Sequence, residues 1–344
     1  MFFIFQVLLF CSIVLYHYPE SVKTRAKKRD EMMNEALITL RVPATSANLG
    51  SGFDALGMAL SLYNVFKVTE LLDEGKFICS VVGEGAGELS DASQNMTVQS
   101  YLEACRIWNL APRGFRHESH NVIPLCRGLG SSSTAVTAGV LIARALSGRQ
   151  IDEQEALRVM TLIEGHPDNV VPCCLGGMTV SCWDGTQLHT VRLAPLPEEL
   201  QVVAAVPAVR VRTHDARRAL PKEVPFSDAV FNLGRAALLC AAWASGQWEH
   251  LSHGMEDRLH QPYRARLFPG GAEVIESARR VPGCIASAIS GSGPTIIAVV
   301  REGSAAAVGS EMCRAFSAAG AASQFFVLQG CANGAQISTA DFSV

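Results

Sequence analysis

The feature that most constrains this chain is a glycine- and serine-rich segment directly before a predicted helix. Residues 124–135 read PLCRGLGSSSTA, and the run 132–146 is packed with Ala, Val and Leu. The two glycines permit a tight turn and a close approach of a ligand to the backbone. Free N–H groups and the positive dipole end of a helix bind anions, and serine hydroxyls there bond phosphate oxygens or ligate Mg²⁺. The segment therefore predicts a phosphate site, with a serine-capped helix after a glycine turn as the alternative.

Two more loops combine glycines with small polar residues. Residues 45–54 read TSANLGSGFD after a predicted strand, and residues 290–295 read SGSGPT between two apolar runs. Glycines between buried strands usually mark a bulge or a close ligand approach. A solvated turn is the alternative interpretation of the first loop, so neither loop identifies a function alone.

The rest of the chain mixes strand-like and helix-like runs without strict alternation, which favours an α+β fold. Predicted strands cover 37–42, 64–71, 77–82, 178–182, 201–206, 285–289, 295–300 and 323–328. Predicted helices cover 95–108, 132–146, 153–163, 229–245, 270–280 and 305–318. The helix at 229–245 is nearly all apolar, so we expect it to be a buried core helix. Pro195 and Pro197 mark a boundary, which predicts domains 33–197 and 198–344.

Residues 1–32 differ from the remainder, with an apolar run at 2–16 followed by a basic run at 23–29. The apolar run is short for a membrane span, which needs about 20 residues. Its charge follows the apolar run, unlike a secretory signal. Three interpretations stand: a membrane anchor, an ordered part of the globule, or upstream sequence before a true start at Met32 or Met33. The last is favoured because the first strand begins immediately afterwards, and it predicts a cytoplasmic protein without membrane attachment.

Composition excludes several classes of protein. Hydrophobic residues make up 49% and charged residues 18% of the 344 residues, which excludes global disorder. The net charge of −3 lacks the basic excess of nucleic-acid-binding domains, so no nucleic-acid partner is expected. The 11 cysteines form no CxxC pair, which argues against a disulfide framework and for a reducing compartment.

The three loops together, PATSANLGSGFDALG, RGLGSSSTA and ISGSGPT, resemble in order and separation the motifs of the GHMP small-molecule kinases. Residues 164–172 (EGHPDNVVP), 213–221 (THDARRALP) and 257–264 (DRLHQPYR) are similar to the versions found in the homoserine kinases. The resemblance covers roughly 36–330. It implies a two-domain α+β fold, with an N-terminal domain of ribosomal protein S5 domain 2-like type and a C-terminal ferredoxin-like domain.

The resemblance also implies an activity. Family members transfer the γ-phosphoryl group of ATP to the side-chain hydroxyl of L-homoserine, a step in threonine biosynthesis that yields O-phospho-L-homoserine. ATP, Mg²⁺ and L-homoserine are the implied ligands, in a cleft between the domains, and a homodimer is a further expectation. Two alternatives stay open: another GHMP kinase acting on mevalonate, a sugar or a related alcohol, and a non-catalytic homologue.

Positions matching the family's motifs are implied site residues. The nucleotide would contact Pro124, Leu125, Arg127, Gly128, Leu129, Gly130, Ser131, Ser132, Ser133, Thr134, Ser290, Gly291, Ser292 and Gly293. Ser132 and Glu164 are the implied Mg²⁺ ligands, with Ser131 as the alternative hydroxyl, since Mg²⁺ prefers oxygen donors. The arginines Arg217 and Arg264 would bind the substrate carboxylate, because guanidinium groups bind carboxylates in bidentate fashion. The remaining pocket-lining residues implied are Asn48, Asp54 and Asn169.

The general base is an open question. Asn169 stands at the position where several relatives place an aspartate, and an amide cannot usefully accept a proton. Asp168 is adjacent, but neighbouring residues of a strand point to opposite faces, so it need not be a substitute. His166 is expected to orient the loop. These catalytic candidates lead us to expect phosphoryl transfer without a dedicated base, through positioning and electrostatics.

Overall fold

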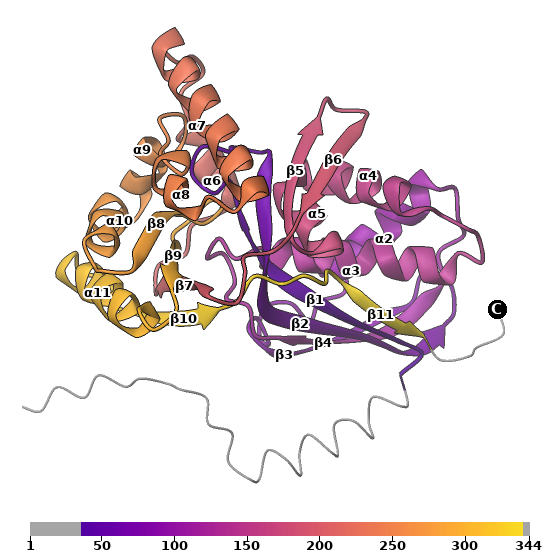
Figure 1. The fold of residues 1–344 in the computed structure, drawn as a ribbon. Helices are drawn as coiled ribbons and strands as arrows, with labels where there is room; N and C mark the ends of the chain where they lie inside the picture. The colour runs from indigo at the N-terminus through magenta and orange to yellow at the C-terminus, as the bar shows by residue number, and fades with distance from the viewer. Residues whose placement is uncertain (1–35, 340–344) are drawn as a thin grey trace, which may run out of the picture.

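The computed structural model describes residues 36–339, which form two sheets with helices packed against them (Figure 1). The strands are β1 Ile38–Ala47, β2 Leu56–Leu72, β3 Phe77–Gly83, β4 Gly114–Asn121, β5 Met178–Trp183, β6 Leu188–Leu193, β7 Leu200–Pro207, β8 Cys284–Ile289, β9 Ile296–Arg301, β10 Ser323–Leu328 and β11 Gln336–Thr339. The helices of six residues or more are α2 Met96–Ile107, α3 Ser131–Leu146, α4 Glu153–Glu164, α5 Pro167–Leu175, α6 Thr213–Arg218, α7 Phe226–Ser245, α10 Gly271–Arg279 and α11 Ala305–Ala318. Two short helices, α8 Leu251–Gly254 and α9 Gln261–Arg264, follow α7.

The first sheet has the strand order β11-β1-β2-β4-β3, and β5 pairs with both β2 and β6. Helices α2 to α5 lie against one face of it (Figure 1). Their apolar side chains pack on those of β1, β2 and β4 in one core cluster, in which Ile38, Phe115 and Ile142 are fully buried. This packing fixes the start of α3, which carries the serine-rich segment.

The second sheet is antiparallel, with the order β10-β7-β9-β8. Helices α10 and α11 share a core cluster with residues of β7, β8 and β9, including Val274 and Val308. A third cluster contains side chains from both sheets, such as Met58 of β2 and Val202 of β7. The two sheets therefore share apolar packing, which positions the loops at their junction. The predicted α+β class is confirmed.

The predicted C-terminal domain, residues 198–344, contains one strand that pairs with the first sheet. β7 opens the second sheet at Leu200, but β11 returns to pair antiparallel with β1 of the first sheet. Residues 336–339 therefore belong structurally with the N-terminal half. Return pairing between distant segments leaves no local sequence pattern.

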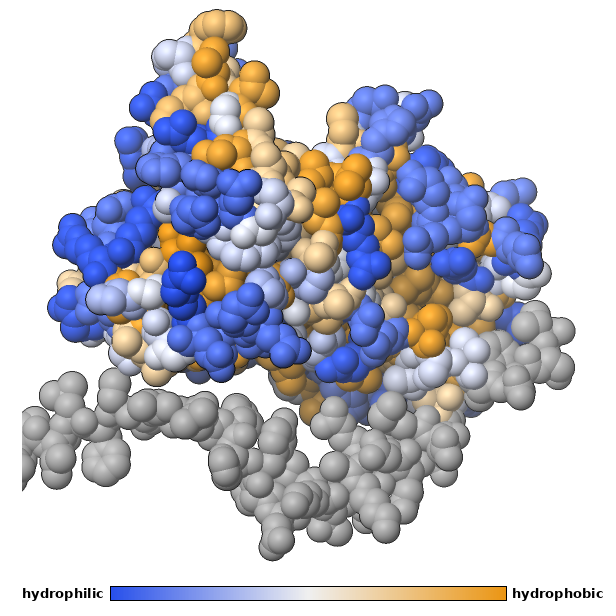
Figure 2. All heavy atoms as spheres, in the orientation of Figure 1, coloured by the Kyte–Doolittle hydropathy of each residue, from blue (hydrophilic) through white to orange (hydrophobic). Residues whose placement is uncertain are grey.

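The prediction of a buried helix at 229–245 is wrong. Only Asn232, Leu239, Ala242 and Trp243 of α7 are buried. Phe226 is 84% exposed and Leu233 72% exposed, and Figure 2 shows the apolar surface along this projecting helix. Apolar composition alone does not distinguish a buried helix from one with an unpaired apolar face.

The sequence did not predict several of the elements. β4 (GFRHESHN) is polar in composition, and α5 contains Pro172 and begins with Pro167 at its first position. β2 has 17 residues and begins at Leu56, eight residues before the predicted strand at 64–71. Asp168 and Asn169 lie in α5 rather than on a strand, and both side chains are buried, so the argument from strand alternation is wrong at this site.

Residues 1–32 lie outside the described residues, so the interpretations of that segment stay as predictions. Between residues 36 and 339, no helix has the length and apolar character needed to cross a membrane.

Candidate active site

The three glycine-containing loops meet at the junction of the sheets. Ser290 Oγ donates to Gly128 O over 2.6 Å and contacts Ser46 Oγ at 2.9 Å. Asn48 Nδ2 donates to Gly291 O at 2.9 Å, and Thr45 N donates to Leu129 O at 3.2 Å. Segments almost 250 residues apart thus form one hydrogen-bonded floor.

Gly128 shows why this floor needs glycine. Its φ is +80°, and an added Cβ would lie 2.2 Å from Ser290 O. L-residues rarely adopt this conformation, and the neighbouring backbone leaves no room for a side chain. The close approach of the two loops therefore depends on this residue.

The serine-rich segment begins α3 as predicted, one residue earlier than expected. Gly130, in the left-handed conformation at φ 70°, precedes Ser131, and no side chain caps the helix. The first N–H groups of the helix are consequently available, and they line a cleft. This arrangement suits an anionic phosphate chain.

Nine of the predicted nucleotide residues line that cleft: Pro124, Arg127, Gly128, Gly130, Ser131, Ser132, Ser133, Gly291 and Ser292. Leu125, Leu129, Thr134, Ser290 and Gly293 are not among the lining residues. Thr134 is fully buried, and its hydroxyl is satisfied because it donates to Ser131 O and accepts from Asn64 Nδ2. Its role is to stabilise the helix start.

The predicted metal ligands Ser132 and Glu164 both line this cleft. Glu164, at the end of α4, accepts a 2.7 Å hydrogen bond at Oε1 from Ser133, while the neighbouring Ser132 is exposed. Burial is the main cause that raises the pKa of Glu164 above its ordinary value. Its Oε2 accepts no hydrogen bond from the described residues, so one carboxylate oxygen and the Ser132 hydroxyl remain for a hard cation. The donor set fits Mg²⁺.

His166, Asp168 and Asn169 also line the cleft and form a chain of contacts. His166 Nδ1 lies 2.5 Å from Asp168 Oδ1, and Asn169 accepts at Oδ1 from Thr45 Oγ1 over 2.8 Å. Burial lowers the pKa of His166, but the carboxylates of Asp168 and Glu164 outweigh it, and the net shift is upward. The contact with His166 therefore occupies Asp168 Oδ1 and fixes the orientation of both side chains.

The predicted substrate residues Asn48, Asp54, Arg217 and Arg264 line the same cleft. Arg217 of α6 donates to both carboxylate oxygens of Asp54, at 2.8 and 2.9 Å. Arg264 of α9 donates from Nη1 to Gly291 O, but its buried Nε has no partner in the described residues. Burial first, and then repulsion by Arg217, lowers the pKa of Arg264 to about 10. Two neighbouring guanidinium groups with one acid and an unsatisfied donor favour binding of an anion.

Phe53 lies beside both arginines, outside the lining of the cleft, and the sequence did not predict its role. The guanidinium carbons of Arg264 and Arg217 lie 5.1 and 5.8 Å from its ring centroid, within the range of cation–π contacts. Its position directly before Asp54 was the available signal. Asp54, His166 and Asp168 were each predicted, but the sequence did not show that their potential ligand atoms lie within 4.8 Å of one another. Asp54 pairs with Arg217, and His166 pairs with Asp168.

Comparison with known proteins places this geometry in a family. The models for the GHMP kinases N-terminal and C-terminal domains match residues 95–177 and 237–318. A homoserine kinase of Carboxydothermus hydrogenoformans is 43% identical over 269 residues, which cover 78% of this chain and 87% of the relative. The chain belongs to the homoserine kinase family of the GHMP kinases. A homoserine kinase of Moorella thermoacetica is 41% identical and covers 87% of this chain and 99% of its own length.

Solved structures support the family's fold. A crystal structure of homoserine kinase from Cytophaga hutchinsonii matches with a TM-score of 0.77 at 30% identity, covering 88% of this chain and 97% of its own. A mevalonate kinase matches with a TM-score of 0.61 but only 12% identity, so it shows the shared GHMP fold alone. The predicted two-domain GHMP kinase fold is confirmed, and a kinase of this family uses ATP.

Proposed function

We propose that this homoserine kinase family member transfers the γ-phosphoryl group of ATP to the side-chain hydroxyl of L-homoserine, forming O-phospho-L-homoserine. The observation that carries the proposal is a single cleft lined both by the guanidinium pair Arg217 and Arg264 and by the first turn of α3. The guanidinium pair is suited to an amino-acid carboxylate, and the helix N-terminus is suited to a triphosphate. Asp54 lies beside Arg217 and is suited to the substrate ammonium.

The amides of the α3 first turn would hold the phosphates, while Ser132 and Glu164 would hold Mg²⁺. When bound, Mg²⁺ offsets the negative charge on the transferring phosphoryl group. Arg217 and Arg264 orient the substrate, so that its hydroxyl lies in line with the phosphorus atom. No dedicated base is assigned, because the Asp168 carboxylate is paired with His166.

The assignment of product is tested by ³¹P NMR of a reaction containing the protein, Mg-ATP and L-homoserine. A phosphomonoester resonance coupled to the γ-methylene protons of homoserine, with stoichiometric ADP, supports the proposal. ADP without that phosphomonoester contradicts it, because phosphate would then have passed to water or to another acceptor.

Asp168→Asn tests catalysis without a dedicated base. We expect kcat to fall by less than about 100-fold, because a general base contributes roughly 10²–10⁴-fold and the asparagine keeps an oxygen facing His166. Steady-state kinetics give kcat, and titration with a fluorescent ATP analogue confirms that the variant binds nucleotide. A fall of about 10⁴-fold with intact nucleotide binding would instead make Asp168 the base.

A homodimer and a cytoplasmic location remain predictions. The exposed apolar face of α7, with Phe226, Val230 and Leu233 at spacings of four and three residues, is the surface that supports an interaction between subunits.

A further inference from the structure

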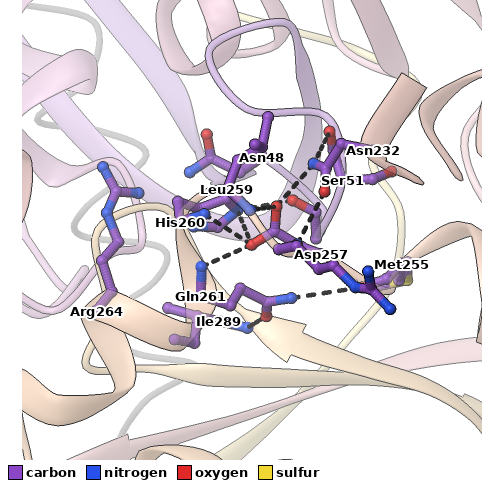
Figure 3. A network of polar contacts seen from close by, with 12 residues as sticks. Asn48, Ser51, Asn232, Met255, Asp257, Leu259, His260, Gln261, Arg264 and Ile289 are labelled. Carbon is purple, nitrogen blue, oxygen red and sulfur yellow. Dashed lines mark hydrogen bonds and ion pairs between the residues drawn. The ribbon is translucent and has the colours of Figure 1, made fainter. Parts of the chain in front are cut away.

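A buried polar cluster lies in the segment between α8 and α9 (Figure 3). Its centre is Asp257, whose side chain is 0% exposed and does not line the cleft. Burial of a carboxylate raises the free energy of the folded state unless hydrogen bonds compensate for the lost contacts with water. The partners of Asp257 therefore show what its burial accomplishes.

Four N–H groups donate to the Asp257 carboxylate. Oδ1 accepts from Leu259 N at 2.9 Å and Asn232 Nδ2 at 2.8 Å. Oδ2 accepts from His260 N at 2.9 Å and Gln261 N at 2.6 Å. Three of the donors are backbone groups at the start of α9, and the fourth is a side chain of α7. One carboxylate therefore links the two helices through hydrogen bonds.

The first consequence concerns the arginine at the end of α9. This helix is only four residues long, so fixing its start also fixes Arg264 one turn later. Gln261 accepts from Ile289 N at 2.8 Å through Oε1, at the end of β8, and Arg264 donates to Gly291 O two residues farther on. The helix capped by Asp257 thus holds the 290–293 loop at two points.

The second consequence concerns the loop that carries Asn48 and Asp54. Because a carbonyl oxygen only accepts, the His260 ring donates from Nε2 to Gly50 O at 2.7 Å. Asn232 also donates to Ser51 O, and Ser51 Oγ donates to Gly254 O at 2.6 Å. A Cβ at Gly50 would lie 2.0 Å from Met255 O, so this loop packs directly on the Asp257 segment.

We propose that Asp257 is a positioning residue for the side chains that would bind the amino acid, which it organises by fixing α9 and the 48–54 loop in one arrangement. The inference rests on the proposed function for the identity of the substrate. The first turn of α3 is held by the packing of α3 on α2 and the first sheet, and the 290–293 loop reaches the glycine-rich loop before it through the Ser290–Gly128 hydrogen bond. The proposal therefore predicts a larger effect on homoserine than on ATP.

Asp257→Asn supplies the kinetic test. The amide group places its own N–H₂ against backbone donors and cannot accept all four hydrogen bonds. We expect the KM for homoserine to rise by at least about tenfold while the KM for ATP changes by less than about threefold. Asp228→Asn is the matched control, because this half-buried acid of α7 lies outside the cleft lining and, among the described residues, forms its ion pair with the exposed Arg258, so both KM values should stay unchanged.

Amide hydrogen exchange supplies a readout that does not depend on turnover. Asp257→Asn should accelerate exchange in residues 259–264 and 289–293 by about tenfold or more, and leave residues 131–135 unchanged. Asp257→Ser is the second variant in both assays should the asparagine variant fail to fold. Equal changes in both KM values, or lower thermal stability with unchanged exchange at 289–293, would overturn the proposal. A wild-type protein inactive on homoserine would instead contradict the proposed function, while the exchange result still decides the role of Asp257.

Discussion

Arg264→Ala is expected to lower kcat/KM for homoserine by at least about 100-fold, while the KM for ATP changes less than about threefold. Hydrogen bonds to a charged group contribute about 1.5–3 kcal/mol each, and the orphaned Nε beside Nη2 offers a carboxylate two of them. A loss of two such bonds corresponds to at least a 100-fold effect. Steady-state kinetics with each substrate varied in turn measure both parameters.

Arg218→Ala is the matched control for that experiment. Arg218 is an exposed arginine of α6, next to Arg217 in sequence, and it does not line the cleft. Its removal should leave both kinetic parameters within about twofold. A similar loss in both variants would mean that the net positive charge of the region matters rather than the guanidinium of Arg264.

Glu164→Gln should lower kcat by at least about 100-fold without destabilising the fold. The carboxylate supplies charge to Mg²⁺, and loss of one preorganised electrostatic group in an active site typically costs about 10²–10³-fold in kcat. The amide oxygen can still accept from Ser133, so the local hydrogen bond survives. Thermal unfolding should therefore occur at the same temperature or a higher one at pH 7.

The pH dependence of that comparison has a definite sign. The pKa of Glu164 is raised in the folded protein, chiefly by burial, so the folded state binds the proton more tightly than the unfolded chain. The resulting stabilisation is fully present below the ordinary pKa of a glutamate and is lost as pH rises through the raised value. The unfolding temperatures of wild type and Glu164→Gln should therefore be similar at low pH. As the pH rises through the raised pKa of Glu164, the variant should unfold at a higher temperature than the wild type.

Exposed Glu153, in the first turn of the same helix, provides the control substitution Glu153→Gln. It should leave kcat unchanged and lower stability slightly, since an acid at a helix N-terminus is favourable. Stability of Glu164→Gln well below that of wild type at pH 7 would contradict the account of its burial. Unchanged kcat in that variant would remove Glu164 from the proposed metal site.

The sequence predicted the parts of the fold whose signals are local. The α3 start follows from glycines before serines, and helices such as Glu153–Glu164 follow from apolar periodicity. α5 escaped because its two prolines and buried polar residues hide the periodicity, although Pro167 at the first helical position is a favourable signal. β11 was not predicted, because only its pairing with the distant β1 defines it. The residues of α7 were predicted as a helix, but its burial was predicted wrongly because apolar residues also cover its exposed side.

The candidate site was predicted through motifs, and its internal contacts were not. All the predicted substrate and catalytic residues line one cleft, as the resemblance implied. The partners of those residues depend on three-dimensional packing: Glu164 contacts Ser133 rather than Ser132, and Asp54 pairs with Arg217. Asp257 stood in a motif already noted for Arg264, but only its buried hydrogen bonds distinguish it from a surface acid.

The central claim is that the cleft selects L-homoserine as the phosphoryl acceptor. ADP release by the chain should be measured with Mg-ATP and L-homoserine, L-serine, mevalonate or galactose in parallel. We expect turnover that is selective for L-homoserine, because the arginine pair and Asp54 are suited to an amino acid and the chain belongs to the homoserine kinase family. A folded, ATP-binding protein that prefers mevalonate or galactose, or that phosphorylates none of the four, would contradict it.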